Sequence, residues 1–160
     1  MKNLSTLLLL LAFFLSGCTT KPKEFSLAFT MESLEVYKIS IEINKDKSYN
    51  IKQQNHFFDA YAMKDQSSNF EGKMTDEEYN ELNALITNCK LFKMKNNYGF
   101  SNNDETNNNP LDNYLYHINY KQGRKEKYIL INPNPLDPYP ENLSGLIKFL
   151  TNFISNHSKT

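Results

Sequence analysis

The stretch MTDEEYNELNALITNC, residues 74–89, contains the clearest helix signal in the chain. Thr75 can accept a hydrogen bond from the free amide of Glu78, and the Glu78 carboxylate can reach back to the Thr75 amide, while Met74 packs on Tyr79. The apolar side chains that follow share one helical face, at Tyr79, Leu82, Leu85, Ile86 and Cys89. We therefore expect an amphipathic helix that begins after Thr75 and ends near Asn88.

The residues before this helix alternate between apolar and polar side chains, which is typical of half-buried strands. Residues 36–43 and 48–54 show this alternation on either side of the turn signal at 44–47, so they predict a hairpin. Residues 25–30 and 57–63 are expected to add one strand each. The N-terminal half is therefore predicted to be antiparallel sheet.

The residues after the helix predict a loop and a second hairpin. Leu91 and Phe92 resemble a buried return segment, and residues 96–113 are rich in Asn with few apolar anchors, so we expect a long mobile loop there. Alternation resumes in residues 114–120 and 125–131 around a glycine-containing turn. These two runs are predicted to pair.

A second helix is expected at the C-terminus. Residues 132–140 contain four prolines and cannot form a continuous helix or strand, but Asp137 before Pro138 suits a helix N-cap and first position. The apolar residues beyond recur at the helical period, at Leu143, Leu146, Ile147, Leu150, Phe153 and Ile154. The order of strands, helix, strands and helix predicts an α+β fold. We expect a two-layer sandwich, in which an antiparallel sheet of hairpins carries two helices packed on one face.

The N-terminus has the features of a secretory signal. Lys2 supplies a positive charge, residues 4–15 are almost wholly apolar, and Ser16 and Gly17 are small. A transmembrane helix is the alternative, but spanning a bilayer takes roughly 20 apolar residues. The polar residues 19–23 end the run before that length is reached.

The residues Leu15, Ser16, Gly17 and Cys18 resemble the lipobox of bacterial lipoproteins. The resemblance implies that a diacylglyceryl group alkylates the Cys18 thiol, that cleavage falls between Gly17 and Cys18, and that fatty acyl chains anchor the mature protein to a membrane. The implied organisation is a signal peptide at 1–17, a lipidated tether at 18–24 and a single α+β domain at 25–156.

The residues after Cys18 bear on the membrane that would hold the anchor. Thr19 and Thr20 follow it, and no acidic residue occurs before Glu24. Among lipoproteins, acidic residues at these positions are associated with the inner membrane or with surface export. The resemblance therefore implies a cell-envelope protein on the outer membrane, facing the periplasm, with a surface lipoprotein of a Gram-positive bacterium as the alternative.

Charge and cysteine content exclude some classes of partner. The chain has 18 basic and 18 acidic residues, so it lacks the net positive charge that gathers nucleic acid, and we expect no nucleic-acid partner. Once Cys18 is lipidated, Cys89 is the one cysteine left, so no internal disulfide can form. Its place on the apolar helix face predicts a buried, unreactive thiol.

The histidines do not predict a catalytic or metal site. His56, His117 and His157 are not spaced for zinc binding, and His117 falls in a strand among aromatic residues, where a hydrogen-bonded structural role is expected. His56 and Asp59 would point to opposite faces of a strand. The motifs of serine hydrolases, phosphate-binding loops and dinucleotide-binding folds are absent.

The Asn-rich segment invites comparison with a calcium loop. Asn102, Asp104 and Thr106 alternate oxygen ligands, but an EF-hand needs glycine and glutamate where this chain has Asn107 and Asn113. We therefore predict no catalytic residue, no metal site and no cofactor.

Tyrosine is concentrated on the second hairpin. Tyr114, Tyr116, Tyr120 and Tyr128 would offer a large contact surface with polar tips, so they are the candidate partner-binding residues. The alternative is that this face packs under the helices and only the hydroxyl groups reach solvent.

From Glu71 to Phe149 the sequence is similar to small bacterial envelope domains that include the emfourin family, protein inhibitors of a metallopeptidase. The residues that carry the similarity are Gly72 to Glu78, Leu82, Leu85, Ile86, Leu91, Phe92, Pro110 to Asp112, Tyr116, Pro140, Leu143, Leu146 and Leu150. The resemblance implies an inhibitor-like binding role.

These patterns together predict a lipid-anchored, non-enzymatic envelope protein that binds another protein or a peptide. The alternatives are a small-ligand-binding or structural lipoprotein, or an enzyme whose site forms only in the folded chain.

Overall fold

The computed structural model describes residues 24–33, 37–55, 66–100, 114–133 and 138–159 of the 160-residue chain. The predicted signal, the lipobox and the strand expected at 57–63 lie outside the described residues. In the described part, no helix has both the length and the apolar character needed to cross a membrane.

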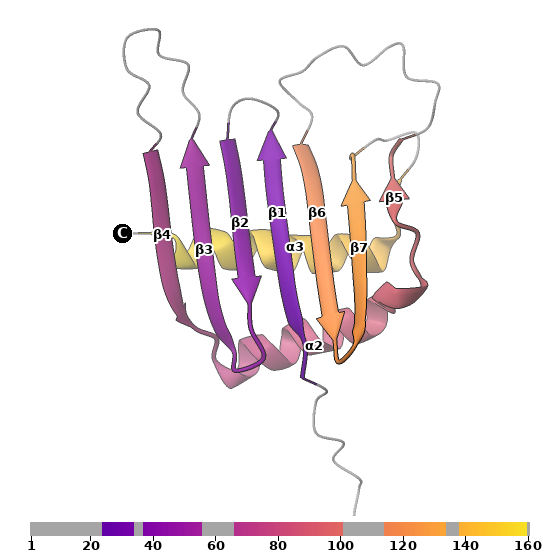
Figure 1. The fold of residues 1–160 in the computed structure, drawn as a ribbon, viewed down its shortest axis with the longest axis horizontal. Helices are drawn as coiled ribbons and strands as arrows, with labels where there is room; N and C mark the ends of the chain where they lie inside the picture. The colour runs from indigo at the N-terminus through magenta and orange to yellow at the C-terminus, as the bar shows by residue number, and fades with distance from the viewer. Residues whose placement is uncertain (1–23, 34–36, 56–65, 101–113, 134–137, 160) are drawn as a thin grey trace, which may run out of the picture.

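Within the described ranges, seven strands form one sheet. They are β1 (Ser26–Ser33), β2 (Tyr37–Ile43), β3 (Ser48–Asn55), β4 (Gln66–Lys73), β5 (Asn97–Tyr98), β6 (Tyr114–Gln122) and β7 (Lys125–Ile131). Their order across the sheet is β4-β3-β2-β1-β6-β7-β5 (Figure 1). All neighbours are antiparallel except β5 and β7, which are parallel. β1 lies at the centre, so Phe29 is opposite Ile41 of β2 and Ile118 of β6.

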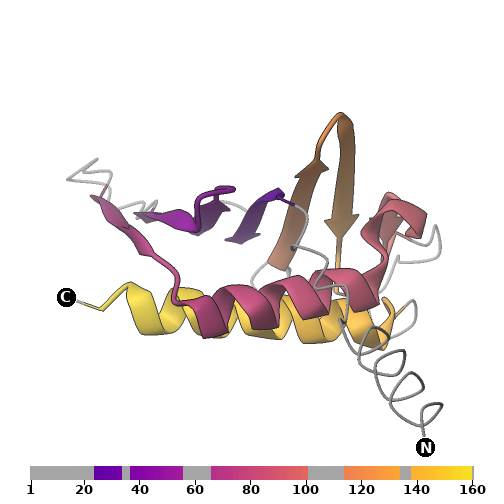
Figure 2. The same ribbon diagram turned by 90° about the horizontal axis from the view of Figure 1, so that it is seen from below.

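Two helices, α2 (Asp76–Cys89) and α3 (Glu141–His157), lie side by side on one face of this sheet (Figure 2). A short 3-10 helix, η1 (Leu91–Lys93), follows α2. The predicted α+β sandwich with both helices on one face is confirmed. The two predicted hairpins, now β2–β3 and β6–β7, are also confirmed.

The start of α2 has the predicted capping box. Thr75 Oγ1 accepts a hydrogen bond from the Glu78 amide at 3.2 Å, and Glu78 Oε2 accepts one from the Thr75 amide at 2.8 Å. The helix ends at Cys89, because Lys90 adopts a left-handed conformation with φ of 51°.

The core fills the space between the sheet and the helices. Every second residue of the central strands points into it, and each predicted apolar position of α3 is buried. The fully buried large side chains are Phe25, Phe29, Ile41, Ile43, Ile51, Leu82, Leu91, Ile118, Ile129, Ile131, Leu143 and Leu146.

The predicted start of the last helix is wrong. α3 begins at Glu141 with Pro140 as its N-cap, not at Asp137 and Pro138. The residue before a proline is disfavoured in helical conformation, so Pro140 keeps Tyr139 out of the helix.

Two strands and one exposed side chain depart from the predictions. β4 was not predicted, because Phe70 is the one large apolar residue in its eight. β5 forms inside the segment expected to be a mobile loop, at 96–113, where Asn97 and Tyr98 pair with β7. Phe92 is 38% exposed rather than buried, whereas its neighbour Leu91 is buried as predicted.

Candidate functional site

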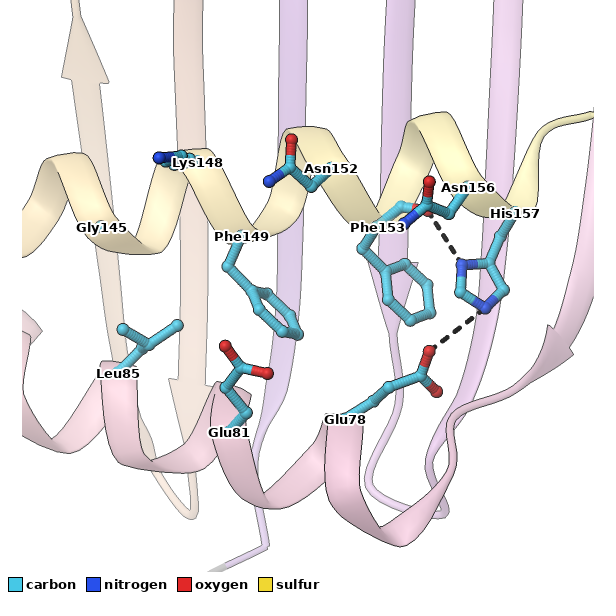
Figure 3. A pocket seen from close by; sticks show the side chains of 10 residues that line it. All are labelled: Glu78, Glu81, Leu85, Gly145, Lys148, Phe149, Asn152, Phe153, Asn156 and His157. Atoms are coloured by element: carbon cyan, nitrogen blue, oxygen red, sulfur yellow. Dashed lines mark hydrogen bonds and ion pairs between the residues drawn. The ribbon is translucent and has the colours of Figure 1, made fainter.

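A groove of about 390 Å³ runs between α2 and α3 on the side that faces away from the sheet (Figure 3). Leu85, Phe149 and Phe153 supply its apolar surface, and the rings of the two phenylalanines stack with centroids 6.2 Å apart. Gly145 presents no side chain beside Leu85. The volume lies in the range of pockets that hold ligands or anchoring side chains.

Two carboxylates from successive turns of α2 line this groove. Glu78 and Glu81 are three residues apart, so both point toward α3 (Figure 3). Glu78 caps the helix with its Oε2 atom. Its other oxygen, Oε1, is 3.3 Å from His157 Nε2. Within the described ranges, Glu81 has no ion-pair or hydrogen-bond partner, while Lys148 of α3 also lines the groove.

His157 closes one end of the groove. Its Nδ1 donates to the Phe153 carbonyl oxygen at 2.9 Å, because a carbonyl can only accept. Nε2 faces the Glu78 carboxylate at 3.3 Å, so the two contacts together fix the orientation of the ring. The ring stacks on Phe153 at 4.0 Å and meets Tyr49 edge-on at 5.4 Å.

The sequence interpretation missed His157, because it ended the predicted domain at residue 156. The signal available was its spacing from Phe153, four residues earlier on the same helix face.

A second cluster lies on the uncovered face of the sheet. Glu32 of β1, His117 of β6 and Tyr128 of β7 form a chain, in which His117 Nε2 is 2.9 Å from Glu32 Oε1 and Nδ1 is 2.5 Å from the Tyr128 hydroxyl. With Lys38, whose Nζ lies 3.7 Å from Glu32, they surround a shallow hollow of about 220 Å³ above the small Ala28.

The direction of these hydrogen bonds follows from the groups involved. An ionised Glu32 only accepts, so His117 Nε2 donates to it, and the free Nδ1 of a neutral ring then accepts from Tyr128. The carboxylate thus fixes the tautomer of the imidazole, and with it the direction of the hydrogen bond from the phenol. Both ring nitrogens have partners, as expected for a structural histidine. No set of three or more metal-ligating side chains occurs among the residues that the structure covers.

The four candidate tyrosines do not form one surface. Tyr116 and Tyr120 point toward the helices, and Tyr120 is only 4% exposed, so it belongs to the core. Tyr128 lies on the opposite face of the sheet. Tyr114 lies at the rim, where its ring is 5.9 Å from that of Tyr37. Burial and the neighbouring Tyr114 raise the pKa of Tyr37 to about 12.

Cys89 is buried, as predicted. Its thiol donates to the Asn142 carbonyl oxygen at 3.1 Å, and burial raises its pKa to about 11. The thiol is therefore protonated near neutral pH and is a poor nucleophile.

Three groups of candidate residues fall outside the described part. They are the lipidation and cleavage residues Gly17 and Cys18, the pair His56 and Asp59, and the calcium candidates Asn102, Asp104 and Thr106.

Comparison with known proteins gives no family for this chain. No protein-family model matches it, and no curated protein matches it significantly. Function therefore has to be argued from the groove, the sheet face and the N-terminal sequence.

Proposed function

We propose that this is a lipid-anchored, non-enzymatic protein of the cell envelope that binds a basic segment of another protein in the groove between α2 and α3. The anchor is the lipid on Cys18, within reach of the domain because Phe25, already in the core, follows Cys18 by seven residues. The outer membrane, facing the periplasm, is the proposed location.

The observation that carries the binding proposal is the pairing of carboxylates with aromatic rings in one groove. A lysine or arginine side chain has an apolar stem and a cationic head, so its stem can cover Phe149 while its head reaches Glu81. Glu81 has no cation of its own in the described chain, which leaves it available for the partner.

A photo-crosslinking amino acid in the groove tests the binding proposal. Placed at Asn152, it should capture a protein in intact envelopes, and the yield should fall when Glu81→Gln removes the charge. The matched control carries the same probe at Lys52, on the uncovered sheet face. Equal capture from both positions, or capture indifferent to Glu81→Gln, would contradict the groove as the binding site.

The anchor has its own test. Radiolabelled palmitate should enter the native protein, and Cys18→Ala should abolish both the labelling and the membrane association. A Cys18→Ala protein that still fractionates with membranes would remove the anchor from the proposal.

A second candidate function is favoured by the Glu32–His117–Tyr128 chain. Three hydrogen-bonded groups around a hollow suit a small polar ligand, which the Tyr128 hydroxyl and the Lys38 ammonium would contact. Tyr128→Phe should then weaken binding of that ligand in a fragment screen followed by NMR. The matched control is Tyr114→Phe, at the rim of the other face.

A further inference from the structure

An exposed aromatic ring lies among cations near the β6–β7 turn, at the end of the sheet where β1 begins. Phe92 of η1 is 38% exposed, and the ammonium of Lys125 lies 5.9 Å from its ring centroid. Lys90, Lys93 and Lys95 are exposed around it in sequence.

The β6–β7 turn adds its own cations to the same surface. Arg124 and Lys125 are exposed there, whereas Lys121 pairs with Glu126 across the hairpin and lies on the uncovered sheet face. Lys127 joins the two segments, because its ammonium donates to the Met94 carbonyl oxygen and to Asn96 Oδ1. We call Phe92 and six cations the basic–aromatic patch; the cations are Lys90, Lys93, Lys95, Arg124, Lys125 and Lys127.

Few acidic groups oppose this charge. Glu126 is in the same turn, but its carboxylate accepts from Asn119 on the uncovered sheet face. Glu24 is exposed where the chain joins the domain. Because the whole chain has equal numbers of acidic and basic residues, six cations against two carboxylates is a strong local separation of charge.

The patch adjoins the point where the N-terminal segment joins the domain. The Phe25 ring is 5.8 Å from that of Tyr120, and Tyr120 is 5.2 Å from Phe92. Figure 1 shows the start of β1 at the same edge of the sheet as the β6–β7 turn. Phe25 follows Cys18 by seven residues, and the chain between them can span at most about 25 Å.

We propose that the basic–aromatic patch lies against the anionic headgroups of the bilayer that holds the lipid, with Phe92 in the interface. The inference rests on the proposed anchor on Cys18. Each cation near an anionic membrane surface shifts the equilibrium toward contact roughly fivefold, and an aromatic ring adds apolar burial. The opposite edge, with Ser33, Tyr37 and Tyr114, then points away from the membrane.

A tryptophan reporter tests this orientation, because the chain contains no tryptophan. The full lipidated protein with Phe92→Trp is reconstituted into vesicles of phosphatidylcholine and phosphatidylglycerol that contain brominated lipid. The fluorescence should be quenched and shifted to the blue. The matched control is Tyr114→Trp, six residues and about 20 Å along β6 from Tyr120. Its fluorescence should stay unquenched.

The role of charge is tested by reversal. Arg124→Glu changes the patch by two charge units, so bilayer contact by the Phe92→Trp reporter should fall by roughly 30-fold. Added salt or pure phosphatidylcholine should weaken the contact in the same direction. The matched control is Lys52→Glu, on the uncovered sheet face, which should leave the quenching unchanged.

The outcomes separate this inference from the anchor. A protein that takes up palmitate and floats with vesicles, but whose Phe92→Trp reporter is not quenched, overturns the orientation and leaves the anchor standing. A protein that takes up no palmitate overturns both. Shielding of the reporter in native membranes but not in protein-free vesicles would assign the patch to a protein and overturn the lipid contact.

Discussion

Gly145 lies in the interior of α3, beside Leu85 of α2, and an alanine there should stabilise the fold. A methyl group at position 145 would lie 3.8 Å from Leu85 Cδ2, which is an ordinary van der Waals contact. Alanine is favoured over glycine in a helix interior by about 1 kcal/mol, in part because it restricts the unfolded chain. We therefore expect Gly145→Ala to raise the free energy of unfolding by about 1 kcal/mol.

Urea unfolding followed by far-UV circular dichroism measures this change, and the melting temperature should rise by about 3 °C. The matched control is Gly72→Ala in β4, where the added methyl would lie 2.4 Å from the Tyr49 hydroxyl oxygen. The Tyr49 ring packs against Phe153 with centroids 5.1 Å apart, so it cannot move freely. The free energy of unfolding of Gly72→Ala should therefore be lower by about 1–3 kcal/mol.

A loss of stability in Gly145→Ala would refute the described packing of α2 on α3, and an unchanged Gly72→Ala would refute the position of Tyr49. The first variant also informs function, since position 145 lines the groove. If the groove binds a partner, the more stable protein should crosslink less well from Asn152. Such a trade of stability against activity is common at binding sites.

The remaining predictions concern the capping box of α2, the buried Cys89 thiol and Gly99, which follows β5. Thr75→Ala removes the acceptor for the Glu78 amide, so the free energy of unfolding measured with urea should fall by about 1 kcal/mol. Cys89 should resist a thiol reagent in the folded protein and react on unfolding. Because burial raises its pKa from 9.0 to about 11, its contribution to stability is complete below about pH 9 and is lost as the pH rises through 11. In Cys89→Ala, the free energy of unfolding should therefore fall less steeply with pH between about 9 and 11. Gly99→Ala should destabilise the protein severely, because Gly99 has φ of 76° and the methyl would lie on the Asn132 carbonyl oxygen.

Three results would contradict these expectations. A Thr75→Ala protein with unchanged stability would show that the capping box does not stabilise α2. Rapid labelling of Cys89 under native conditions would show that the thiol is accessible. A Gly99→Ala protein with wild-type melting behaviour would contradict the parallel pairing of β5 with β7.

The elements that could be predicted are those whose pattern is local. Thr75 and Glu78 are three residues apart, and the six apolar residues of α3 repeat along one helix, so the sequence reports them directly. The hairpins were likewise predictable, since each pairs neighbouring segments. β4 and β5 were not, because an edge strand needs few apolar residues and β5 is defined by backbone pairing with a distant segment.

The candidate sites were harder to predict, because their residues meet only through the register of the sheet and the packing of the helices. Glu32 and His117 are 85 residues apart and come together because β1 pairs with β6. The tyrosines illustrate the reverse case. Tyr120 and Tyr128 are on the same hairpin, but the residue that pairs with Tyr128 is Asn119, which is adjacent to Tyr120. Paired residues share a face of the sheet and adjacent residues alternate, so the two tyrosines lie on opposite faces.

The central position of β1 has a consequence for how the chain can fold as it emerges. β1 comes first in the described chain, yet one of its neighbours is β6, and α3, one of the two described helices that cover the sheet, comes last. During synthesis from the N-terminus, the early strands therefore expose apolar surface that is fully covered only when almost the whole chain is available. Pairing between segments this far apart in the sequence is slow, and the apolar surface exposed in the meantime makes the incomplete chain prone to aggregation.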